Sequence, residues 1–241
     1  MKIIYEPKGA AREYSELALN LYTGCEHGCK YCYAPSCRFK TKEEYFSNQY
    51  VRKDVLNLLE KDLKEMSKNE DKRRVLFCFI CDPYQKGEDF NITTRQALSL
   101  FKKYNISFQV LTKGGMKAIR DFDLYKKGDA FAVTLTFLDK NKSLEWEPKA
   151  ALPLERIESL KVAHSKGIET WVSFEPVIEC EECLKLIDET YKFVDLYKIG
   201  KINHYKDAPT QNWEKFTKEV IEKLEKLGKK YYIKDSLKKY L

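Results

Sequence analysis

Residues 21–35 read Leu-Tyr-Thr-Gly-Cys-Glu-His-Gly-Cys-Lys-Tyr-Cys-Tyr-Ala-Pro, which puts Cys25, Cys29 and Cys32 in a C-x3-C-x2-C array. Three thiols this close together along the chain point to an iron–sulfur cluster. A four-iron cluster is usually held by four cysteines, so three would leave one iron free to coordinate another molecule. The array therefore predicts a cluster loop at 21–35, with the chemistry at the open iron.

Structural zinc and a disulfide are the alternatives for these cysteines. Structural zinc normally uses two pairs of Cys or His set apart along the chain, and the array offers only three close ligands. His27 could be a fourth, but it lies inside the C-x3-C loop, where its side chain would have to fold back. The spacing favours the cluster over both alternatives.

The chain is long enough for one domain with a substantial core. It has 241 residues, of which 43% are hydrophobic and 34% charged, and its mass is 28.4 kDa. Folds of about 200–250 residues often form a single unit, and the 13 Phe and 16 Tyr can supply aromatic walls. We expect one globular domain over 1–241.

The sequence has no membrane or export signal. A membrane helix needs about 18 consecutive apolar residues, and no stretch reaches that length. The first residues also lack the apolar core of a secretory signal. We therefore expect a cytoplasmic, oxygen-sensitive protein without membrane partners, whose eight cysteines stay reduced.

The net charge of +7 comes from 44 Lys and Arg against 37 Asp and Glu, and the sequence pI is about 8.8. Most of the excess is Lys spread along the predicted helices. An obligate DNA-reading domain usually has a pI above about 9 and a local basic cluster. The charge permits nucleic-acid binding but does not by itself indicate it.

Short β-rich apolar runs alternate with longer segments of helical period, which predicts βαβ units around a parallel sheet. The predicted strands are 19–23, 75–80, 107–111, 130–136, 169–174, 194–199 and 230–233. The predicted helices are 42–66 with an interruption, 94–103, 116–126, 153–166, 181–193 and 213–226, and several end at glycine. The pattern fits a doubly wound sheet as well as a barrel. In both folds, catalytic groups gather at the carboxyl ends of the strands.

The cysteine array resembles the signature of radical S-adenosylmethionine (SAM) enzymes. The fuller string over 24–33, Gly-Cys-Glu-His-Gly-Cys-Lys-Tyr-Cys-Tyr, resembles the branch related to spore photoproduct lyase, and the likeness extends over about 21–199. The resemblance implies an α/β fold, a partial (β/α)6 barrel of the TIM type, with 201–241 as a C-terminal extension. It also implies two cofactors, a 4Fe-4S cluster and SAM.

The activity implied by this resemblance is radical chemistry. An enzyme of this kind cleaves SAM to methionine and a 5′-deoxyadenosyl radical, which abstracts hydrogen from a substrate, and it takes its electron from a donor such as flavodoxin or ferredoxin. Likeness to spore photoproduct lyase suggests DNA or RNA as the substrate, for repair or base modification, while a peptide or small metabolite stays open. A noncatalytic redox-sensing or metal-binding protein is the alternative.

Two tyrosines flank the third cysteine of the array. Tyr31 and Tyr33 lie on either side of Cys32, and the resemblance implies that aromatics there lie beside the cluster and SAM. Packing in the core is the other interpretation of both rings.

A second motif follows the predicted strand 75–80. Residues 81–85, Cys-Asp-Pro-Tyr-Gln, resemble the D-P-Y-Q segment of spore photoproduct lyase-like proteins, which implies that Asp82 contacts the amino group of SAM and makes Tyr84 a candidate catalytic residue. The lyases proper use a cysteine near this strand end as a hydrogen-atom donor. Matching on Asp82 puts Phe79 at that position, so repair of the same lesion is not expected. Cys81, at the strand mouth, is the candidate catalytic thiol, and Cys78 reads as a buried hydrophobe.

The remaining candidates follow later strands. Residues 112–115, Thr-Lys-Gly-Gly, resemble a segment whose lysine, here Lys113, pairs with the SAM carboxylate. Thr134 and Thr136 alternate with apolar residues, so both hydroxyls face one way, and the resemblance places this strand end near SAM. Glu147 and Glu175 each put a carboxylate beside a turn or strand end, and Glu175 is the preferred polar active-site residue.

Two features stay open. Cys180 and Cys183 form a C-x2-C pair with Cys37 as the one other unassigned thiol, so an auxiliary cluster is only a weak hypothesis on ligand counting. The polar stretch 201–212, which includes His204, reads either as a lid or as a plain surface loop.

Overall fold

The computed structural model describes residues 2–203 and 205–241, and at Phe90 and Asn91 only the backbone. His204 of the predicted lid therefore lies outside the described residues. Seven parallel strands form one sheet in the order β1-β4-β5-β6-β7-β8-β9. They are β1 (Leu17–Leu19), β4 (Val75–Phe77), β5 (Phe108–Thr112), β6 (Ala130–Thr134), β7 (Glu169–Val177), β8 (Leu196–Lys201) and β9 (Lys230–Ile233). The predicted partial (β/α) barrel is confirmed, and β9 adds a seventh strand to it.

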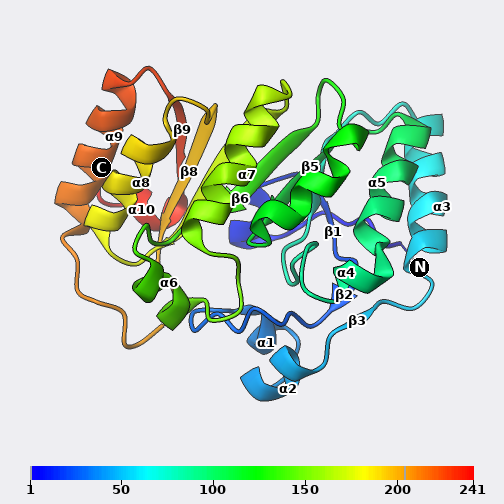
Figure 1. Cartoon of the computed structure of the whole chain (residues 1–241), viewed down its shortest axis with the longest axis horizontal. Helices are drawn as coiled ribbons and strands as arrows, with labels where there is room; N and C mark the ends of the chain where they lie inside the picture. The colour runs from blue at the N-terminus through cyan, green and yellow to red at the C-terminus, as the bar shows by residue number, and fades with distance from the viewer. Residues whose placement is uncertain (1, 204) are drawn as a thin grey trace.

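Helices cover the convex face of this sheet (Figure 1). They are α3 (Val55–Lys68), α5 (Thr93–Tyr104), the 3-10 helix η2 (Gly115–Leu124), α7 (Pro153–Ser165), α8 (Cys180–Thr190) and α9 (Trp213–Lys226). The shorter helices are η1 (Gly9–Glu13), α1 (Ala34–Cys37), α2 (Lys42–Ser47), α4 (Glu88–Asn91), α6 (Lys140–Trp146) and α10 (Asp235–Lys238). No helix in the described part of the chain is both long and apolar enough to cross a membrane.

The two faces of the sheet carry side chains of different size, because residues alternate between faces along each strand. Large apolar groups such as Phe77 and Phe131 pack under the helices in the main core. The concave face is lined by smaller groups, among them Ala130 and Ala132, which join Trp171 in a separate cluster. The concave face therefore carries small side chains on the central strand β6.

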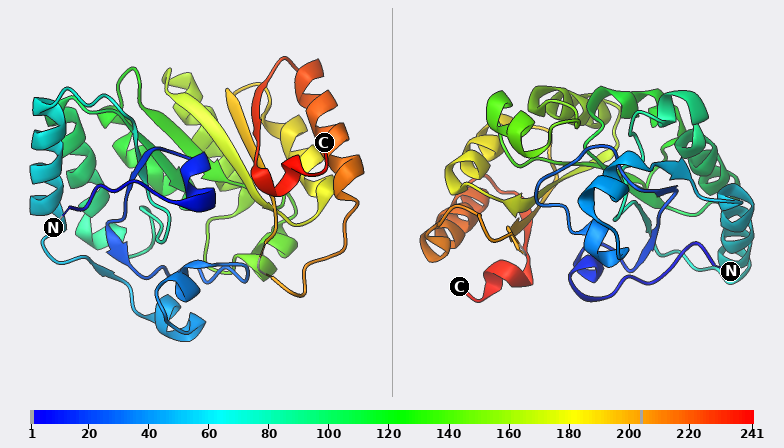
Figure 2. Two further views of the ribbon diagram at one scale, coloured as in Figure 1. Left: turned by 180° about the vertical axis from the view of Figure 1, so that it is seen from behind. Right: turned by 90° about the horizontal axis from the view of Figure 1, so that it is seen from below.

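The N-terminal segment crosses the concave face (Figure 2, left). The N–H of Tyr5 donates to the carbonyl of Ala18 at 2.9 Å, which anchors the segment antiparallel to β1. After η1 the chain returns through Tyr14, whose ring packs against Trp171. This segment fills the space that the alanines leave on the open side of the barrel.

The predicted first strand, 19–23, is wrong in its position. The sheet strand β1 ends at Leu19, and the next strand, β2 (Tyr22–Thr23), pairs antiparallel with β3 (Tyr50–Val51) in a second, two-stranded sheet. Asn20 marks the break, because its buried Oδ1 accepts hydrogen bonds from the N–H groups of Phe79 and Ile80, at 2.9 and 3.0 Å. A polar side chain in the apolar run thus ends the strand.

The predicted helix 42–66 is interrupted, as expected, but by a strand. It divides into α2, which starts at the capping box of Thr41 and Glu44, then β3, then α3. The predicted helix 116–126 forms the 3-10 helix η2 instead of an α-helix. Its buried residues Ala118, Asp121 and Leu124 recur every third position, which matches the three residues per turn of a 3-10 helix.

The helix ends and the tail follow the sequence closely. Gly128, Gly167 and Gly228 adopt positive φ angles of 99°, 73° and 64°, as expected of glycines after helices. The Lys- and Tyr-rich tail forms β9 and α10 and extends the barrel wall. The short helices α1, α4, α6 and α10 were not predicted, because each has only one or two turns and little periodicity.

Candidate active site

The cluster loop follows β2 and lies beyond the carboxyl ends of the strands of the seven-stranded sheet. It packs against α2. Gly24 has a φ of +79°, and a Cβ there would lie 2.3 Å from the carbonyl oxygen of Asn48. Only glycine allows this approach. The three thiols are free, with Cys29 buried and Cys25 and Cys32 partly buried.

These thiols are a fitting donor set for iron. Burial raises the pKa of all three, that of Cys29 to about 12, while Lys113 acts in the opposite direction on Cys29 and Cys32. A metal must therefore displace their protons when it binds. Thiolates are the ligands by which proteins hold iron–sulfur clusters, so the residues present fit a 4Fe-4S cluster.

The same thiols do not form a site for one ion. Within residues 2–203 and 205–241, no three Cys, His, Asp or Glu side chains are grouped closely enough to hold a single metal ion. The ligands of a four-iron cluster bind different irons and need not converge on one point. The buried ring of His27 lies with Nδ1 3.6 Å from Oδ2 of Asp82, where burial lowers its pKa and Asp82 opposes that shift. Asp82 therefore engages this candidate zinc ligand.

Asp82 joins the ends of two strands. Its Oδ1 accepts hydrogen bonds from Oγ1 of Thr112 at 2.6 Å and from the N–H of Tyr84 at 2.8 Å, and its Oδ2 accepts from the N–H of Lys113 at 2.7 Å. The carboxylate is 6% exposed. It thus holds the segment after β4 against the Thr-Lys-Gly-Gly segment after β5.

Gly114 allows these two segments to approach each other. A Cβ at this position would lie 2.5 Å from Cβ of Tyr84 and 2.9 Å from its carbonyl oxygen. Side chains do not tolerate such contacts without a shift of the backbone. The position of Lys113 therefore depends on the glycine that follows it.

Lys113 and Tyr31 lie next to each other beside Cys29. Nζ of Lys113 is 5.6 Å from the centre of the Tyr31 ring. Burial opposes the charge of the lysine, but Cys29 and Glu147 raise its pKa above the usual value. The Tyr31 hydroxyl donates to Oε1 of Glu147, and Oε2 of Glu147 lies 2.7 Å from Nη1 of Arg156. This group carries two cations and one carboxylate.

Thr134 ends β6 and faces the concave side, in line with Ala130 and Ala132, while Thr136 lies in a bend beyond the strand, which was predicted to run to residue 136. The carbonyl of Thr134 accepts a hydrogen bond from Nη1 of Arg156 at 3.0 Å. Three buried polar atoms in the described part of the chain lack a hydrogen-bond partner around this edge of the sheet, namely Oγ1 of Thr136, Nη2 of Arg156 and Nε2 of Gln85. Unpaired buried groups are rare in folded proteins, and these three suit a polar cofactor.

Cys81 and Tyr33 lie at the mouth of β4. Cys81 is buried, with Sγ 4.0 Å from Oδ1 of Asn20, and its thiol interacts with that of Cys78. Tyr33 is 47% exposed and donates to the carbonyl of Phe79 at 3.2 Å. The two residues thus come from different loops to one edge of the sheet.

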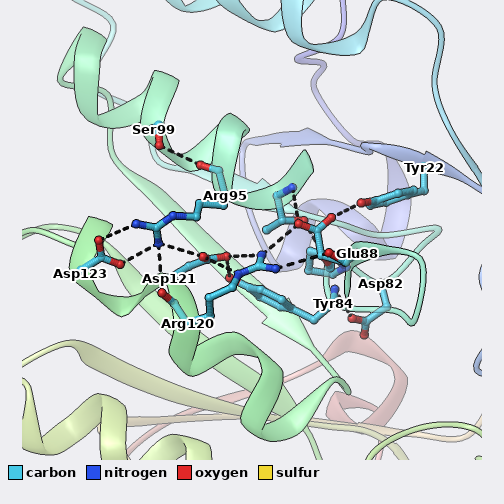
Figure 3. A network of polar contacts seen from close by, with 11 residues as sticks. Tyr22, Asp82, Tyr84, Glu88, Arg95, Ser99, Arg120, Asp121 and Asp123 are labelled. Carbon is cyan, nitrogen blue, oxygen red and sulfur yellow. Dashed lines mark hydrogen bonds and ion pairs between the residues drawn. The ribbon is translucent and has the colours of Figure 1, made fainter. Parts of the chain in front are cut away.

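Tyr84 points into a buried network of charged groups (Figure 3). Its hydroxyl donates to Oδ2 of Asp121 at 3.0 Å. Asp121 also accepts from Nη2 of Arg120 at 2.8 Å, and that nitrogen lies 3.0 Å from Oε1 of Glu88. The network ties the 82–88 segment to η2 and engages the Tyr84 hydroxyl on the side of the helices.

Glu175 lies on the concave face near the end of β7. Its Oε2 accepts hydrogen bonds from the hydroxyl of Tyr14 at 2.6 Å and from Nζ of Lys234 at 2.5 Å. Ser173, two residues earlier on the same face, lies with Oγ 2.7 Å from the Tyr14 hydroxyl. These four side chains come from β7, the N-terminal segment and the end of β9.

The sequence model of the radical SAM superfamily matches residues 19–194. The chain belongs to the radical SAM superfamily. Members use a 4Fe-4S cluster and SAM, so the thiols of the cluster loop are the expected ligands of the cluster. The match begins at the last residue of β1 and includes β2 to β7, the cluster loop, and the segments that carry Asp82 and Lys113.

The curated relatives that match this chain are described as uncharacterised proteins. A protein of Methanocaldococcus jannaschii is 28% identical over 194 residues, which are 78% of this chain and 71% of the relative. A Mycobacterium tuberculosis protein is 23% identical over 181 residues, 71% of this chain and 52% of the relative. The chain thus spans about half the length of the mycobacterial protein.

Solved radical SAM enzymes share the fold. A spore photoproduct lyase mutant superposes with a TM-score of 0.72 at 12% identity and covers 94% of this chain and 79% of its own. Streptococcus suis SuiB bound to S-adenosylmethionine gives 0.64 at 11% identity, covering 90% of this chain but 46% of SuiB. At such identities the likeness shows the fold alone.

Sequence reasoning missed four residues of this radical SAM barrel: Tyr14, Arg156, Lys198 and Lys234. Arg156 lies on the buried face of α7 beside Ile157, and an arginine at a core position was the available signal. Lys198 lies between Tyr197 and Ile199 in β8, so the alternation turns it to the concave face. Its Nζ donates to the carbonyl of Tyr14 at 2.8 Å, and burial lowers its pKa to about 8.

The C-x2-C pair lies apart from the cluster loop. Cys180 and Cys183 begin α8, and burial raises the pKa of both thiols. Cys37 lies instead near Cys32, whose charged form it disfavours. Cys37, the third thiol that an auxiliary cluster would need, therefore lies beside the cluster loop. This placement weakens the hypothesis of an auxiliary cluster.

Proposed function

We propose that this radical SAM enzyme abstracts hydrogen from a nucleic-acid substrate, as a step in base modification or repair. Cys25, Cys29 and Cys32 would hold the cluster, and the segments after β4, β5 and β6 would hold SAM. When bound, these groups supply one-electron cleavage of the sulfonium carbon–sulfur bond. The observation that carries the proposal is that the cluster loop, the polar segments after β4 and β5, and the exposed ring of Tyr33 beside Phe79 meet at one edge of the sheet.

Lys113 and Arg156 are the proposed partners of the SAM carboxylate. Both are cations beside Cys29, and Nη2 of Arg156 lacks a partner among the described residues. Glu147 neutralises only part of their charge. A carboxylate placed between a lysine and a guanidinium gains charge-assisted hydrogen bonds that a buried site strengthens.

Asp82 and the threonines are the proposed partners of the other polar groups of SAM. Asp82 keeps Thr112 and the Lys113 backbone in place, so its first role is to fix the loop that carries the lysine. A carboxylate is also the acceptor that an amino group needs, since an ammonium only donates. The unpaired hydroxyl of Thr136 is suited to a ribose or carboxylate oxygen.

Glu175 is the proposed contact to the substrate. Within the described residues its hydrogen bonds go to Oε2, which leaves Oε1 able to accept from a bound molecule. Phe79 lies nearby and is partly exposed, and its ring packs against the buried rings of Tyr14 and Trp171 behind it. A planar base with hydrogen-bond donors suits such a mouth, because bases stack on aromatic rings. Cys81 is proposed as the thiol nearest this mouth.

Structural neighbours supply weaker support. A spore photoproduct lyase mutant with a dinucleoside spore photoproduct has a TM-score of 0.68 to this chain at 13% identity. SuiB bound to its precursor peptide SuiA scores 0.66 at 12% identity, but this chain spans only 48% of it. A nucleic-acid substrate is therefore preferred over a peptide in this proposal.

The test is an anaerobic incubation of reconstituted protein with SAM and dithionite, with DNA, RNA, a peptide mixture or no addition. The proposal predicts 5′-deoxyadenosine in all samples, faster with one nucleic acid, and deuterium transfer from labelled nucleic acid into 5′-deoxyadenosine. Glu175→Gln should remove the stimulation and leave the basal cleavage. Stimulation by peptide alone, or a cluster without any SAM cleavage, would contradict the proposal, and the second result would favour a redox sensor.

A further inference from the structure

The segment between the cluster loop and α3 projects beyond the carboxyl ends of the strands (Figures 1 and 2). It consists of α1, α2 and β3. Helix α1 begins directly after the last cluster cysteine, with Tyr33 as its N-cap. Any molecule that contacts α1 therefore lies within a few residues of a cluster ligand.

Phe39 has an unusual backbone and an unusual exposure. Its φ is +53° and its side chain is 99% exposed. It follows α1 at the position where the N–H of Phe39 donates to the carbonyl of Ser36, at 3.2 Å, and the N–H of Lys40 donates to that of Pro35, at 3.1 Å. This is the Schellman arrangement, in which glycine is the usual residue at the left-handed position. A phenylalanine there lowers stability on two counts, through the left-handed backbone and through the exposed ring.

The residues beside Phe39 are basic. Arg38 is exposed and Lys40 is partly exposed, and neither takes part in an ion pair within the described residues. Residues 30–53 hold six Lys and Arg against two Glu, so this stretch supplies over half of the net charge of +7. This stretch of the chain thus carries a local excess of positive charge, of which Arg38 and Lys40 lie beside the exposed ring.

A hollow of about 360 Å³ lies between Phe39 and the half-exposed ring of Tyr50. Its wall also includes Thr23, Cys37, Arg38, Lys40 and Tyr45. An exposed aromatic anchor beside a hollow, with unpaired cations around it, has the composition of a protein–protein interface, where aromatic and arginine side chains supply most of the affinity.

We propose that this surface, formed by Arg38, Phe39, Lys40 and Tyr50, docks an acidic electron-carrier protein of the flavodoxin or ferredoxin type. The inference rests on the proposed function, because the carrier provides the electron that SAM cleavage consumes. One electron leaves the reduced cofactor of the carrier and is gained by the cluster. Phe39 inserts into the carrier surface, and the cations steer its acidic rim.

The position favours a carrier over a nucleic acid. A substrate must reach the concave face near Glu175, whereas a carrier needs only the edge of the cluster loop, where α1 adjoins Cys32. Sequence-independent sites for single strands present successive aromatic rings along a basic groove. Here two exposed rings, Phe39 and Tyr50, flank one compact hollow. The surface is thus shaped for a single protruding contact.

The chain offers a matched control for Phe39. Glu70 follows α3 in the same arrangement, with a φ of +53°, its N–H donating to the carbonyl of Ser67 and that of Asp71 to Met66. Phe39→Gly and Glu70→Gly should both raise Tm, since each relieves a left-handed side chain. Only Phe39→Gly should weaken binding of the carrier.

The experiment measures calorimetric binding of a low-potential acidic flavodoxin to the reconstituted protein at low and high salt. It also compares SAM cleavage driven by reduced flavodoxin with that driven by dithionite. We expect Arg38→Glu/Lys40→Glu and Phe39→Gly to raise Kd at least tenfold, and the charge reversal to remove the salt dependence. Dithionite-driven cleavage should match the wild type in both.

Several results would overturn the docking surface. They are the absence of flavodoxin binding to the wild type, an equal Kd for the variants, and loss of oligonucleotide binding in the variants while flavodoxin binding is unchanged. Absence of dithionite-driven cleavage in the wild type would instead refute the proposed function. The Kd comparison would still decide whether the surface binds the carrier.

Discussion

Glu147 and Arg156 form an ion pair of 2.7 Å in which both side chains are almost fully buried. Burial alone would raise the pKa of Glu147, but Arg156 and Lys113 hold it below its usual value. The carboxylate also accepts from the Tyr31 hydroxyl. The pair therefore links α7 to the cluster loop through one buried charge.

Removing this carboxylate should destabilise the fold strongly. Glu147→Gln would leave Arg156 buried without a counter-charge, and breaking a buried pair costs about 3–5 kcal/mol. We expect a loss of about 3 kcal/mol in the free energy of unfolding, measured by urea titration. Glu158→Gln is the control, since its pair with Lys161 spans 3.6 Å and is half-exposed. Similar losses of unfolding free energy in both variants would show that the buried pair contributes no more to stability than the exposed one.

Gly114→Ala should disturb the site through sterics alone. Its φ is not left-handed, but the added Cβ would lie 2.5 Å from Cβ of Tyr84. We expect a loss of about 2 kcal/mol in unfolding free energy, as for overpacked cores, together with weaker SAM binding as Lys113 shifts. Gly167→Ala, where the new Cβ meets nothing within 4 Å, should cost only about 1 kcal/mol for its left-handed backbone. A smaller loss for Gly114→Ala than for the control would contradict the close approach.

Lys198 should make stability rise with pH. Burial, the largest cause, lowers its pKa to about 8 from 10.5, so between these values the unfolded chain binds a proton that the folded chain has lost. Stability then increases with pH in this window, by about 2 kcal/mol between about pH 7.5 and 9.5. Lys198→Met should lack this increment, relative to the wild type and to Lys218→Met on the surface. If the unfolding free energies of Lys198→Met and the wild type changed in parallel with pH, the lowered pKa of Lys198 would be refuted.

Tyr84→Phe should separate stability from catalysis. The hydroxyl donates to buried Asp121, which keeps its bonds to Arg120 and Arg95 without it. We expect a loss of about 1 kcal/mol in unfolding free energy and an unchanged rate of SAM cleavage per folded molecule. A rate reduced more than about tenfold, or roughly 1.4 kcal/mol of barrier, would instead support the catalytic role first predicted for Tyr84.

The parts of the site that could be predicted are local in sequence. The cysteine array, Asp82 and Lys113 each follow a strand within a few residues, so the motif and the β/α rhythm together place them at one edge of the sheet. The contacts between side chains on the concave face could not be predicted in this way. Tyr14 and Ser173 are 159 residues apart, and Lys234 and Ala10 are 224 apart, and no local pattern reports such contacts.

Single residues account for two errors in the predicted elements, one in the end of a strand and one in the type of a helix. Asn20 ends β1 early because its side chain binds the β4 exit loop, a tertiary effect that the apolar run 17–22 hides. The 3-10 geometry of η2 was hidden because Phe122 adds an apolar position that mimics an α-helical face. In both places the hydrophobic pattern was visible in the sequence. The contacts that decide the conformation come from residues elsewhere in the chain.

The most direct test of the account is the iron content and the electron paramagnetic resonance (EPR) signal of anaerobically reconstituted protein, with and without SAM. The account predicts about four irons per chain and a reduced-cluster signal that changes on addition of SAM. Cys29→Ala should lose both, while Cys37→Ala, which alters an exposed thiol outside the array, should keep both. Iron retained in Cys29→Ala, or a wild-type signal indifferent to SAM, would contradict the assignment of the open iron.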